Sequence, residues 1–209
     1  MMTRPHRIFS CLVALCLAAP ALADDGQLYQ DPADPNASFV RVVSPGETLA
    51  VVESRTFDNV KGGVTPYVMV TSNRVSVAVG DLESNADIAP ASFYTFIVGA
   101  EGSIAMVKDE ITNSPAKADL VFYNLSDLPT VDLFVPKANA IALEAIAPGT
   151  SRQVTLKAPL ILDFEVRNGD ATLAVLPEVE MRRRAGVTVV FSGTAGSYSA
   201  YSTENLYSN

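Results

Sequence analysis

The sequence predicts an all-β protein built from two tandem β-sandwich domains related by an internal duplication. Short apolar runs recur along most of the chain and are separated by Gly, Pro, Asn and Asp, which is typical of strands joined by turns. In residues 75–79 the larger apolar residues recur with a period of two, as in a half-buried strand. The order of the runs in the first half returns in the second half.

The first half begins with a polar lead-in over residues 24–36, which two Asp-Pro pairs keep extended. A series of strands is expected to follow, because each apolar run stops at turn-forming residues. These strands cover residues 39–43, 48–53, 67–70, 74–79, 92–98 and 103–107. The sequence Asn-Ser-Pro at residues 113–115 then breaks the pattern and marks a link between two units.

The second half repeats this organisation, with strands expected over residues 119–124, 131–135, 152–156, 160–166, 171–176 and 186–191. Residues 138–147 have a helix-forming composition, but their larger apolar residues do not make a helical stripe and Pro148-Gly149 ends the segment. A strand is therefore favoured there. From residue 194 onward Ser, Thr, Tyr and Gly predominate, which predicts a flexible tail over 194–209.

Four stretches of the first half correspond to stretches of the second, with an offset that grows through loop insertions. The pairs are 39–44 with 120–125, 57–60 with 143–146, the strand ending at Val79 with the strand ending at Val166, and 93–99 with 187–193. The predicted domains are accordingly an N-terminal sandwich with its leader over 24–112, a linker over 113–117 and a C-terminal sandwich over 118–193. We expect the two sandwiches to be separable.

An N-terminal secretory signal is expected over residues 1–23. Arg4 and Arg7 give the basic start, residues 8–19 the apolar run and residues 21–23 the small-x-small cleavage site, so cleavage is expected between Ala23 and Asp24. The apolar run of about 12 residues is too short to cross a bilayer core of roughly 30 Å as a helix. We therefore expect a secreted protein with no membrane insertion.

Cleavage would remove the chain's one histidine, His6, and both of its cysteines, Cys11 and Cys16. A mature chain without imidazole or thiol has no Ser-His-Asp relay and no thiolate nucleophile, and zinc, copper and haem sites depend on the same residues. We therefore expect no enzyme activity, no catalytic residue, no cofactor and no metal site. The core must also be stable without disulfides.

The mature chain is strongly acidic: without Arg4 and Arg7 it has 13 basic residues against 23 acidic ones, a net charge of −10. This charge argues against binding to nucleic acid or to anionic membranes. The one basic run, Arg182, Arg183 and Arg184, is the candidate contact for an acidic polymer or partner, because arginine pairs with carboxylates through two hydrogen bonds. The alternative is a charged hairpin turn that keeps a sheet edge from pairing.

Two further motifs have spacings found in enzymes. Ser114 and Lys117 have the S-x-x-K spacing of serine acylases, but that chemistry needs both residues at the start of a helix, and here they fall in the predicted linker. Carboxylates two residues apart on predicted strands stand side by side on one sheet face, whereas a glycosidase pair faces across a cleft. Those carboxylates are Asp163 with Glu165 and Glu178 with Glu180. A solvated sheet face is the expected reading.

Four segments resemble the AlgF family of periplasmic alginate O-acetylation proteins. They are Asp-Asp-Gly-Gln-Leu-Tyr at 24–29, Ser-Phe-Val-Arg-Val at 38–42, Tyr-Thr-Phe-Ile-Val at 94–98 and Lys-Ala-Asp-Leu-Val-Phe-Tyr-Asn-Leu-Ser-Asp at 117–127. The resemblance touches both repeats and most of the mature chain. It is weakest over 138–149 and in the tail.

The resemblance implies a periplasmic protein required for adding acetyl groups to a secreted exopolysaccharide, alginate or a related polymer. It also implies partners: a membrane-bound O-acyltransferase and periplasmic SGNH-type acetyltransferases. No functional residue can be transferred, because the family provides no catalytic motif. We expect a non-catalytic adaptor that bridges the acetyltransferase components and contacts the polysaccharide weakly. The main alternative is a polysaccharide-binding module that presents polymer to the acetyltransferase, and a third is a structural β-protein unrelated to acetylation.

Overall fold

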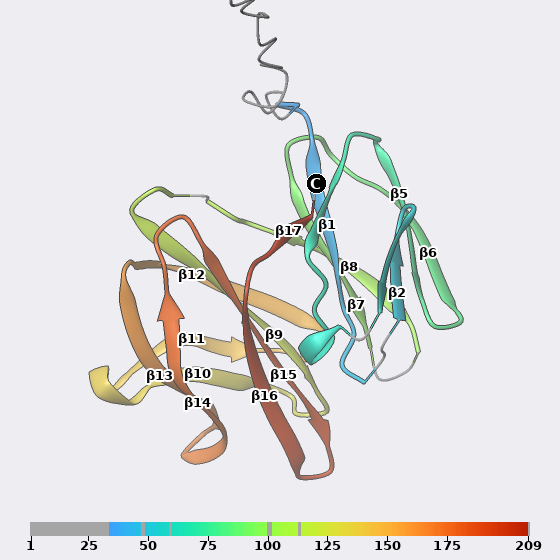
Figure 1. Cartoon of the computed structure of the whole chain (residues 1–209). Helices are drawn as coiled ribbons and strands as arrows, with labels where there is room; N and C mark the ends of the chain where they lie inside the picture. Colours follow the sequence, from blue (N-terminus) through green and yellow to red (C-terminus); the bar gives the residue numbers. More distant parts are fainter. Residues whose placement is uncertain (1–33, 47–48, 59, 100–101, 113, 209) are drawn as a thin grey trace, which may run out of the picture. The chain divides into compact units, whose positions relative to one another are not determined.

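Four β-sheets and two single-turn 3-10 helices make up the computed structural model, which describes residues 34–46, 49–58, 60–99, 102–112 and 114–208 (Figure 1). The prediction of an all-β fold is confirmed. The predicted signal peptide, the cleavage site at Ala23 and Asp24, and most of the leader lie outside the described residues. Residues 34–209 cluster into one unit.

The first half of the chain supplies sheet A, with strand order β17-β4-β1-β7-β8, and sheet B, with strand order β3-β2-β5-β6. Their strands are β1 (Ser38–Val43), β2 (Leu49–Val52), β3 (Arg55–Asp58), β4 (Tyr67–Val70), β5 (Arg74–Val79), β6 (Leu82–Asp87), β7 (Phe93–Val98), β8 (Ile104–Asp109) and, from the far end of the chain, β17 (Tyr207–Ser208). The 3-10 helix η2 (Lys61–Gly63) lies between β3 and β4.

The second half supplies sheet C, with strand order β12-β9-β15-β16, and sheet D, with strand order β11-β10-β13-β14. Their strands are β9 (Lys117–Ser126), β10 (Val131–Val135), β11 (Ala140–Ile146), β12 (Thr150–Lys157), β13 (Leu160–Asn168), β14 (Ala171–Met181), β15 (Gly186–Thr194) and β16 (Ser197–Glu204). The 3-10 helix η3 (Pro136–Ala138) lies between β10 and β11. The strand favoured over 138–147 is thus present as β11.

The two halves share one topology, since adding eight to the strand numbers of β1–β8 gives the strand orders of sheets C and D. Each half has a parallel central pair: β1 with β7, which aligns Phe39 with Phe93, and β9 with β15, which aligns Leu120 with Val187. The four correspondences found in the sequence fall on equivalent strands. The duplication itself stays a prediction. The residues matched between the two halves do occupy equivalent register positions in sheets A and C, since Phe39 pairs with Phe93 and Leu120 pairs with Val187.

Each half encloses its own apolar core between two sheets. Val40, Val42 and Phe96 of sheet A meet Val75 and Val77 of sheet B, and all five are buried. The second core is built in the same way from sheets C and D. Its largest fully buried side chains are Leu120, Phe122, Leu133, Ile146, Phe164, Met181 and Phe191.

A third apolar cluster joins the two halves. Val43 and Ile97 of sheet A pack with Val121, Tyr123 and Val190 of sheet C, so these two sheets face each other and the layer order is B-A-C-D. The central strands β1 and β9 are therefore covered on both faces. This explains why they appear in the sequence as nearly continuous apolar runs rather than alternating ones.

The predicted flexible tail over 194–209 is wrong for most of its length. Residues 197–204 form β16, which pairs with β15 over eight residue pairs, and residues 207–208 form β17, which pairs in parallel with β4. Serine, threonine and tyrosine gave no apolar periodicity here, yet β-branched and aromatic residues suit a half-exposed strand. Backbone pairing defines both elements: β16 forms a hairpin with β15, and β17 pairs with the sequence-distant β4.

Among the residues that the structure describes, no helix has the length and apolar character needed to cross a bilayer.

Candidate functional site

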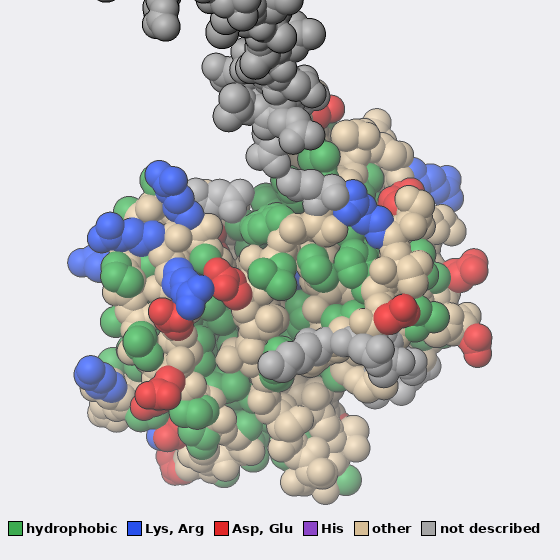
Figure 2. All heavy atoms as spheres, in the orientation of Figure 1, with side chains coloured by type: hydrophobic (Ala, Val, Ile, Leu, Met, Phe, Trp, Pro, Cys, Tyr) green, Lys and Arg blue, Asp and Glu red, His purple; other side chains and the backbone are tan. Residues whose placement is uncertain are grey.

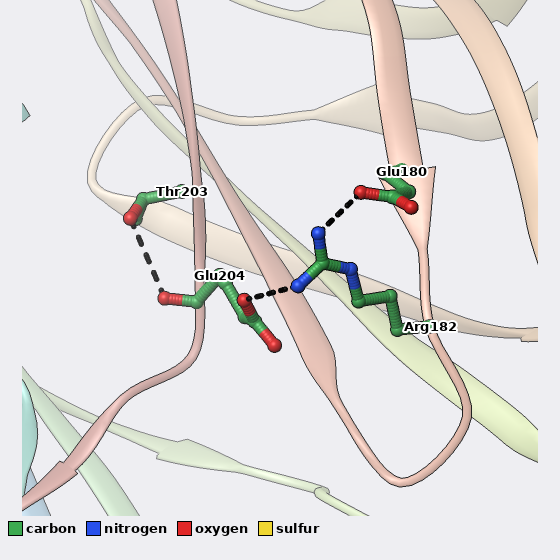
Figure 3. A network of polar contacts seen from close by, with 4 residues as sticks. All are labelled: Glu180, Arg182, Thr203 and Glu204. Atoms are coloured by element: carbon green, nitrogen blue, oxygen red, sulfur yellow. Dashed lines mark hydrogen bonds and ion pairs between the residues drawn. The ribbon is translucent and has the colours of Figure 1, made fainter.

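The candidate basic run, Arg182 to Arg184, lies in the turn between β14 and β15, as the hairpin alternative predicted. Arg182 donates a 2.6 Å hydrogen bond to Glu180, and its guanidinium lies 3.6 Å from Glu204 on β16 (Figure 3). The Thr203 hydroxyl donates to the backbone carbonyl oxygen of Glu204. All three charged side chains of the ion pairs are about half exposed, so water screens the pairs and they add little to stability.

These contacts reduce what the basic run can offer to an outside anion. The hydrogen bond from Arg182 lowers the pKa of Glu180 and raises the pKa of Arg182 itself, which means that both groups stay charged and paired. Arg183 donates from its Nε to the carbonyl oxygen of Ala158 at 3.0 Å. Among the described residues of this run, only Arg184 makes no hydrogen bond or ion pair. Two of the three arginines therefore stabilise the turn through contacts within the chain. Their role as a contact for an outside partner or polymer remains a prediction.

Asp163 and Glu165 make hydrogen bonds within the hairpin of β13 and β14. Asp163 accepts the backbone N–H of Glu178 at 2.8 Å, and Glu165 accepts hydrogen bonds from Arg167 and Thr172. These hydrogen bonds, the one from Arg167 first, lower the pKa of Glu165. Each carboxylate thus stabilises the β13–β14 hairpin rather than facing another across a cleft.

Ser114 likewise lacks the setting that a serine acylase needs. Its hydroxyl accepts the N–H of Ala116 at 3.4 Å in a turn, and Lys117 begins the strand β9. The S-x-x-K spacing therefore spans a turn and a strand, so the helical geometry that would place Lys117 beside Ser114 does not form.

The structure contains a buried network around Arg41 that the sequence analysis did not predict. Arg41, on β1, is 1% exposed and donates to Thr95 at 3.0 Å, Thr188 at 2.7 Å, Asn205 at 3.0 Å and Tyr123 at 3.0 Å. Three of these four partners come from the other half of the chain. The sequence signal was present: a single arginine in the middle of an apolar strand, where a charge is tolerated only when it is fully hydrogen bonded.

Asp109 supplies the negative charge of the same network. Its carboxylate accepts hydrogen bonds from Tyr67 at 2.9 Å, Thr95 at 2.5 Å and Tyr123 at 2.5 Å, so the hydroxyl groups bridge it to Arg41. Burial raises the pKa of both Tyr67 and Tyr123, which keeps them protonated as donors. Burial alone would lower the pKa of Arg41, but the surrounding oxygen atoms outweigh it and raise that pKa.

This network fastens sheet A to sheet C and is closed to solvent. The Arg41 guanidinium also lies over the Tyr67 ring, 4.2 Å from its centroid. Tyr67 and Tyr123 are both buried, so their rings are not available to stack against a sugar. The network thus holds the two halves together from the interior of the protein.

Two adjoining grooves open where sheets A and C meet. Their volumes are about 560 Å³ and 350 Å³, and both are lined by Pro45, Gly46 and Ser192. The larger groove also contains Ser44, whose buried hydroxyl has no hydrogen-bond partner, and the smaller one contains Tyr201. The described residues that line these grooves have uncharged side chains, which suit hydroxyl or acyl groups.

The outer face of sheet D carries exposed aliphatic side chains. Ile141, Phe134, Glu165 and Val175 follow one another across strands β11, β10, β13 and β14 in register, and Arg167 lies over the Phe134 ring at 3.4 Å. Ile141 is 52% exposed and Val175 is 58% exposed. On the face seen in Figure 2, hydrophobic side chains are spread among polar atoms, and acidic and basic side chains lie mainly toward the two sides.

Comparison with known proteins gives one family. The family model described as "Alginate O-acetyl transferase AlgF" matches residues 12–192, which cover most of the chain. The alginate biosynthesis protein AlgF of Pseudomonas syringae pv. tomato is 25% identical over 191 residues, covering 88% of this chain and 83% of that protein. The resemblance found in the sequence is confirmed.

Proposed function

We propose that this chain, which belongs to the AlgF family, is a non-catalytic periplasmic adaptor required for O-acetylation of a secreted exopolysaccharide. Membership of this family indicates involvement in alginate O-acetylation. The proposed adaptor bridges the components that perform the reaction, namely a membrane-bound O-acyltransferase and SGNH-type acetyltransferases. The polymer is alginate or a closely related uronate.

The layer order B-A-C-D is the observation that carries the adaptor role. Sheets A and C cover each other, and the Arg41 network fastens them, so the outer faces of sheets B and D belong to one connected unit. An adaptor needs two surfaces that are held together without a long flexible linker, because a fixed connection raises the effective concentration of one partner near the other. This arrangement supports bridging.

The residues also support a non-catalytic role, although the family description contains the word transferase. His6, Cys11 and Cys16 all precede the predicted cleavage site, so the mature chain has no imidazole or thiol to activate a nucleophile. Ser114 lies in a turn without the geometry of an acylase. The purified mature protein should therefore neither hydrolyse acetyl esters nor transfer acetyl groups, and Ser114→Ala should leave cellular acetylation unchanged. Esterase activity that disappears in the Ser114→Ala variant would contradict the proposal.

Deleting the gene tests the adaptor role directly. Polymer should still be made, but its acetyl content should fall, and the tagged protein should co-purify with a membrane-bound or periplasmic acetyltransferase. Unchanged acetylation in the deletion strain would overturn the proposal.

The grooves between sheets A and C favour a second candidate function, which is binding of the polysaccharide. Ser44 offers a buried hydroxyl without a partner, and Tyr201 offers an aromatic ring nearby. The net charge of −10 opposes a uronate polymer, so affinity for unacetylated polymer should be weak. Any binding that exists should depend on the arginine run, so it should fall with salt and in the Arg182→Ala, Arg183→Ala, Arg184→Ala variant. Tight, salt-insensitive glycan binding without a recovered protein partner would favour this function over the adaptor.

A further inference from the structure

We propose that the outer face of sheet D is a docking surface for a protein of the acetylation machinery whose contacting surface is apolar at its centre and basic at its rim. This inference rests on the adaptor function and names the surface that one of its partners would use. The surface is defined by Ile141, Phe134, Glu165, Arg167 and Val175.

These residues form a continuous row because strand register places them side by side. Ile141 pairs with Phe134, Phe134 with Glu165, and Glu165 with Val175, and directly paired residues project from the same face of a sheet. Ile141 and Val175 are more than half exposed at the two ends of the row. An aliphatic pair on opposite edge strands therefore faces solvent, and between the two lie Phe134, which is only 9% exposed beneath Arg167, and Glu165.

The centre of the row is held in a fixed conformation. Arg167 lies flat over Phe134 and donates to Glu165 at 2.7 Å from Nε and 2.6 Å from Nη2, while Thr172 donates to the same carboxylate oxygen. A preordered arginine loses little side-chain entropy on binding, and arginine and aromatic residues are enriched where protein interfaces gain most of their energy.

The equivalent surface in the first half shows that the fold does not need this apolar row. The corresponding row on sheet B is Thr56, Val51, Ala78 and Glu83, with strands β3, β2, β5 and β6 in place of β11, β10, β13 and β14. It contains no aromatic residue, and its two end residues are polar. Sheet B has an exposed Leu49 on β2, but an exposed aliphatic pair at the two ends of this row occurs on sheet D and not at the equivalent positions of sheet B, so the topology does not require it.

The charges around the row indicate which kind of partner would bind there. The four strands of sheet D contain six acidic residues and one basic residue, Arg167. The acidic residues are Asp132, Glu144, Asp163, Glu165, Glu178 and Glu180. A uronate polymer would be repelled by this surface, whereas a protein with lysine and arginine around an apolar centre would be attracted and would associate faster.

The test measures binding of the full mature chain to a purified SGNH-type acetyltransferase of the same acetylation system by surface plasmon resonance. The variant Ile141→Arg with Val175→Arg adds two positive charges at exposed positions and removes the aliphatic contact. It should weaken binding by about tenfold or more, since hot-spot changes typically cost at least 1.4 kcal/mol, a factor of ten. The neutral variant Ile141→Ser with Val175→Ser should weaken it in the same direction.

The matched control is Thr56→Arg with Asn85→Arg. It adds the same charge at exposed positions on β3 and β6, which are the edge strands of sheet B equivalent to β11 and β14. This control should bind within about twofold of the wild type, because it leaves sheet D intact. Circular dichroism melting should show that all variants are folded.

The outcomes separate this inference from the adaptor function. If the wild type binds and both sheet D variants bind equally well, the docking surface is wrong and the adaptor function stands. If the wild type binds no acetyltransferase and its deletion leaves polymer acetylation unchanged, both fail. If the sheet D variants lose affinity for acetylated polymer rather than for the acetyltransferase, the occupant is the polymer and the inference is overturned.

Discussion

Arg41 shows how a single side chain determines the relation between two halves of a protein. An arginine can be buried because its planar fork donates several hydrogen bonds at once, which a lysine ammonium cannot match in the same geometry. Here those donors reach residues 54, 82, 147 and 164 positions away in the sequence. Arg41 thus stabilises the packing of sheet A against sheet C.

Replacing Arg41 with Met should destabilise the fold by about 3–5 kcal/mol, because Asp109 would stay buried without its compensating cation. Arg41→Lys should recover only part of this loss. Urea unfolding followed by circular dichroism measures both, with the exposed Arg184→Met as a control that should stay within about 0.5 kcal/mol of the wild type. A loss below about 1 kcal/mol for Arg41→Met would show that the network contributes little.

The buried tyrosines predict a loss of stability in alkaline solution. Burial raises the pKa of Tyr67 and Tyr123, so the folded chain keeps two protons that the unfolded chain releases near its ordinary pKa of about 10. Stability from this source is complete below pH 10 and falls as the pH rises further, since the folded state then binds more protons than the unfolded state. Urea midpoints between pH 8 and 11 measure the slope.

Tyr123→Phe is the control for this pH effect, because it removes one of the two groups. It should make the alkaline slope shallower while lowering stability at neutral pH through the lost hydrogen bonds to Asp109 and Arg41. An unchanged slope would mean that Tyr123 ionises at the same pH in both states.

None of these partners could be predicted from the sequence, although Arg41 itself stands out there. Apolar periodicity identifies a strand and the face that it buries, but it contains no information about which distant strand covers that face. Tyr123 and Thr188 occupy positions in the predicted strands 119–124 and 186–191 where the second face of the sheet is buried. Their role follows only once sheets A and C are known to face each other.

At the scale of elements, strand β17 is the smallest and joins the most distant parts of the chain. Tyr207 stacks on Tyr67 at 5.6 Å between ring centroids and meets Phe39 edge-on at 5.7 Å. Ser208 accepts a 2.6 Å hydrogen bond from Arg55. Two residues of strand therefore extend sheet A by one strand and fix the end of the chain to the first half.

Changing Tyr207 to Ala should cost about 1–2 kcal/mol, since it removes ring contacts that each contribute about 0.5–1.5 kcal/mol. Tyr207→Phe keeps the ring and should stay close to the wild type. Hydrogen exchange gives the local readout: the amides of β4 should lose protection in the alanine variant and keep it in the phenylalanine variant. Equal protection in both would show that β17 does not stabilise β4.

The sequence predicted the strands with strong apolar patterns and missed those defined by their neighbours. Residues 67–70 and 131–135 match strand bounds because large apolar residues mark both of their ends, and residues 74–79 match because three valines alternate with small residues after Arg74. By contrast β6 has the sequence Leu-Glu-Ser-Asn-Ala-Asp, whose inward positions are occupied partly by small residues, and it is held by its backbone ladder to β5. Such a strand has no hydrophobic signature of its own.

On the scale of the whole molecule, the interface between sheets A and C makes the two sandwiches interdependent. The sequence predicts separable domains joined near residues 113–117. The structure adds a shared apolar cluster, the Arg41 network and the pairing of β17 with β4. Each half thus depends on the other to cover one sheet face.

We therefore expect the chain to unfold in one cooperative transition rather than two. A fragment of residues 24–112 would expose Val43 and Ile97 and leave Arg41 without Tyr123, Thr188 and Asn205, so it should unfold at a markedly lower urea concentration. Circular dichroism and tyrosine fluorescence should give coincident curves for the intact chain. Two resolved transitions, or a fragment as stable as the whole, would show that the sandwiches are independent.

The pairing of β17 with β4 has a consequence for the order of events during synthesis. The chain is made from its N-terminus, and the partner of Tyr67 and Val68 is Tyr207 and Ser208. Sheet A therefore cannot be completed until some 140 residues after β4 have also been made, and the backbone edge of β4 stays open meanwhile. Nascent chains that stop before residue 207 should present this edge to other strands, so truncated products should aggregate more readily than the full chain.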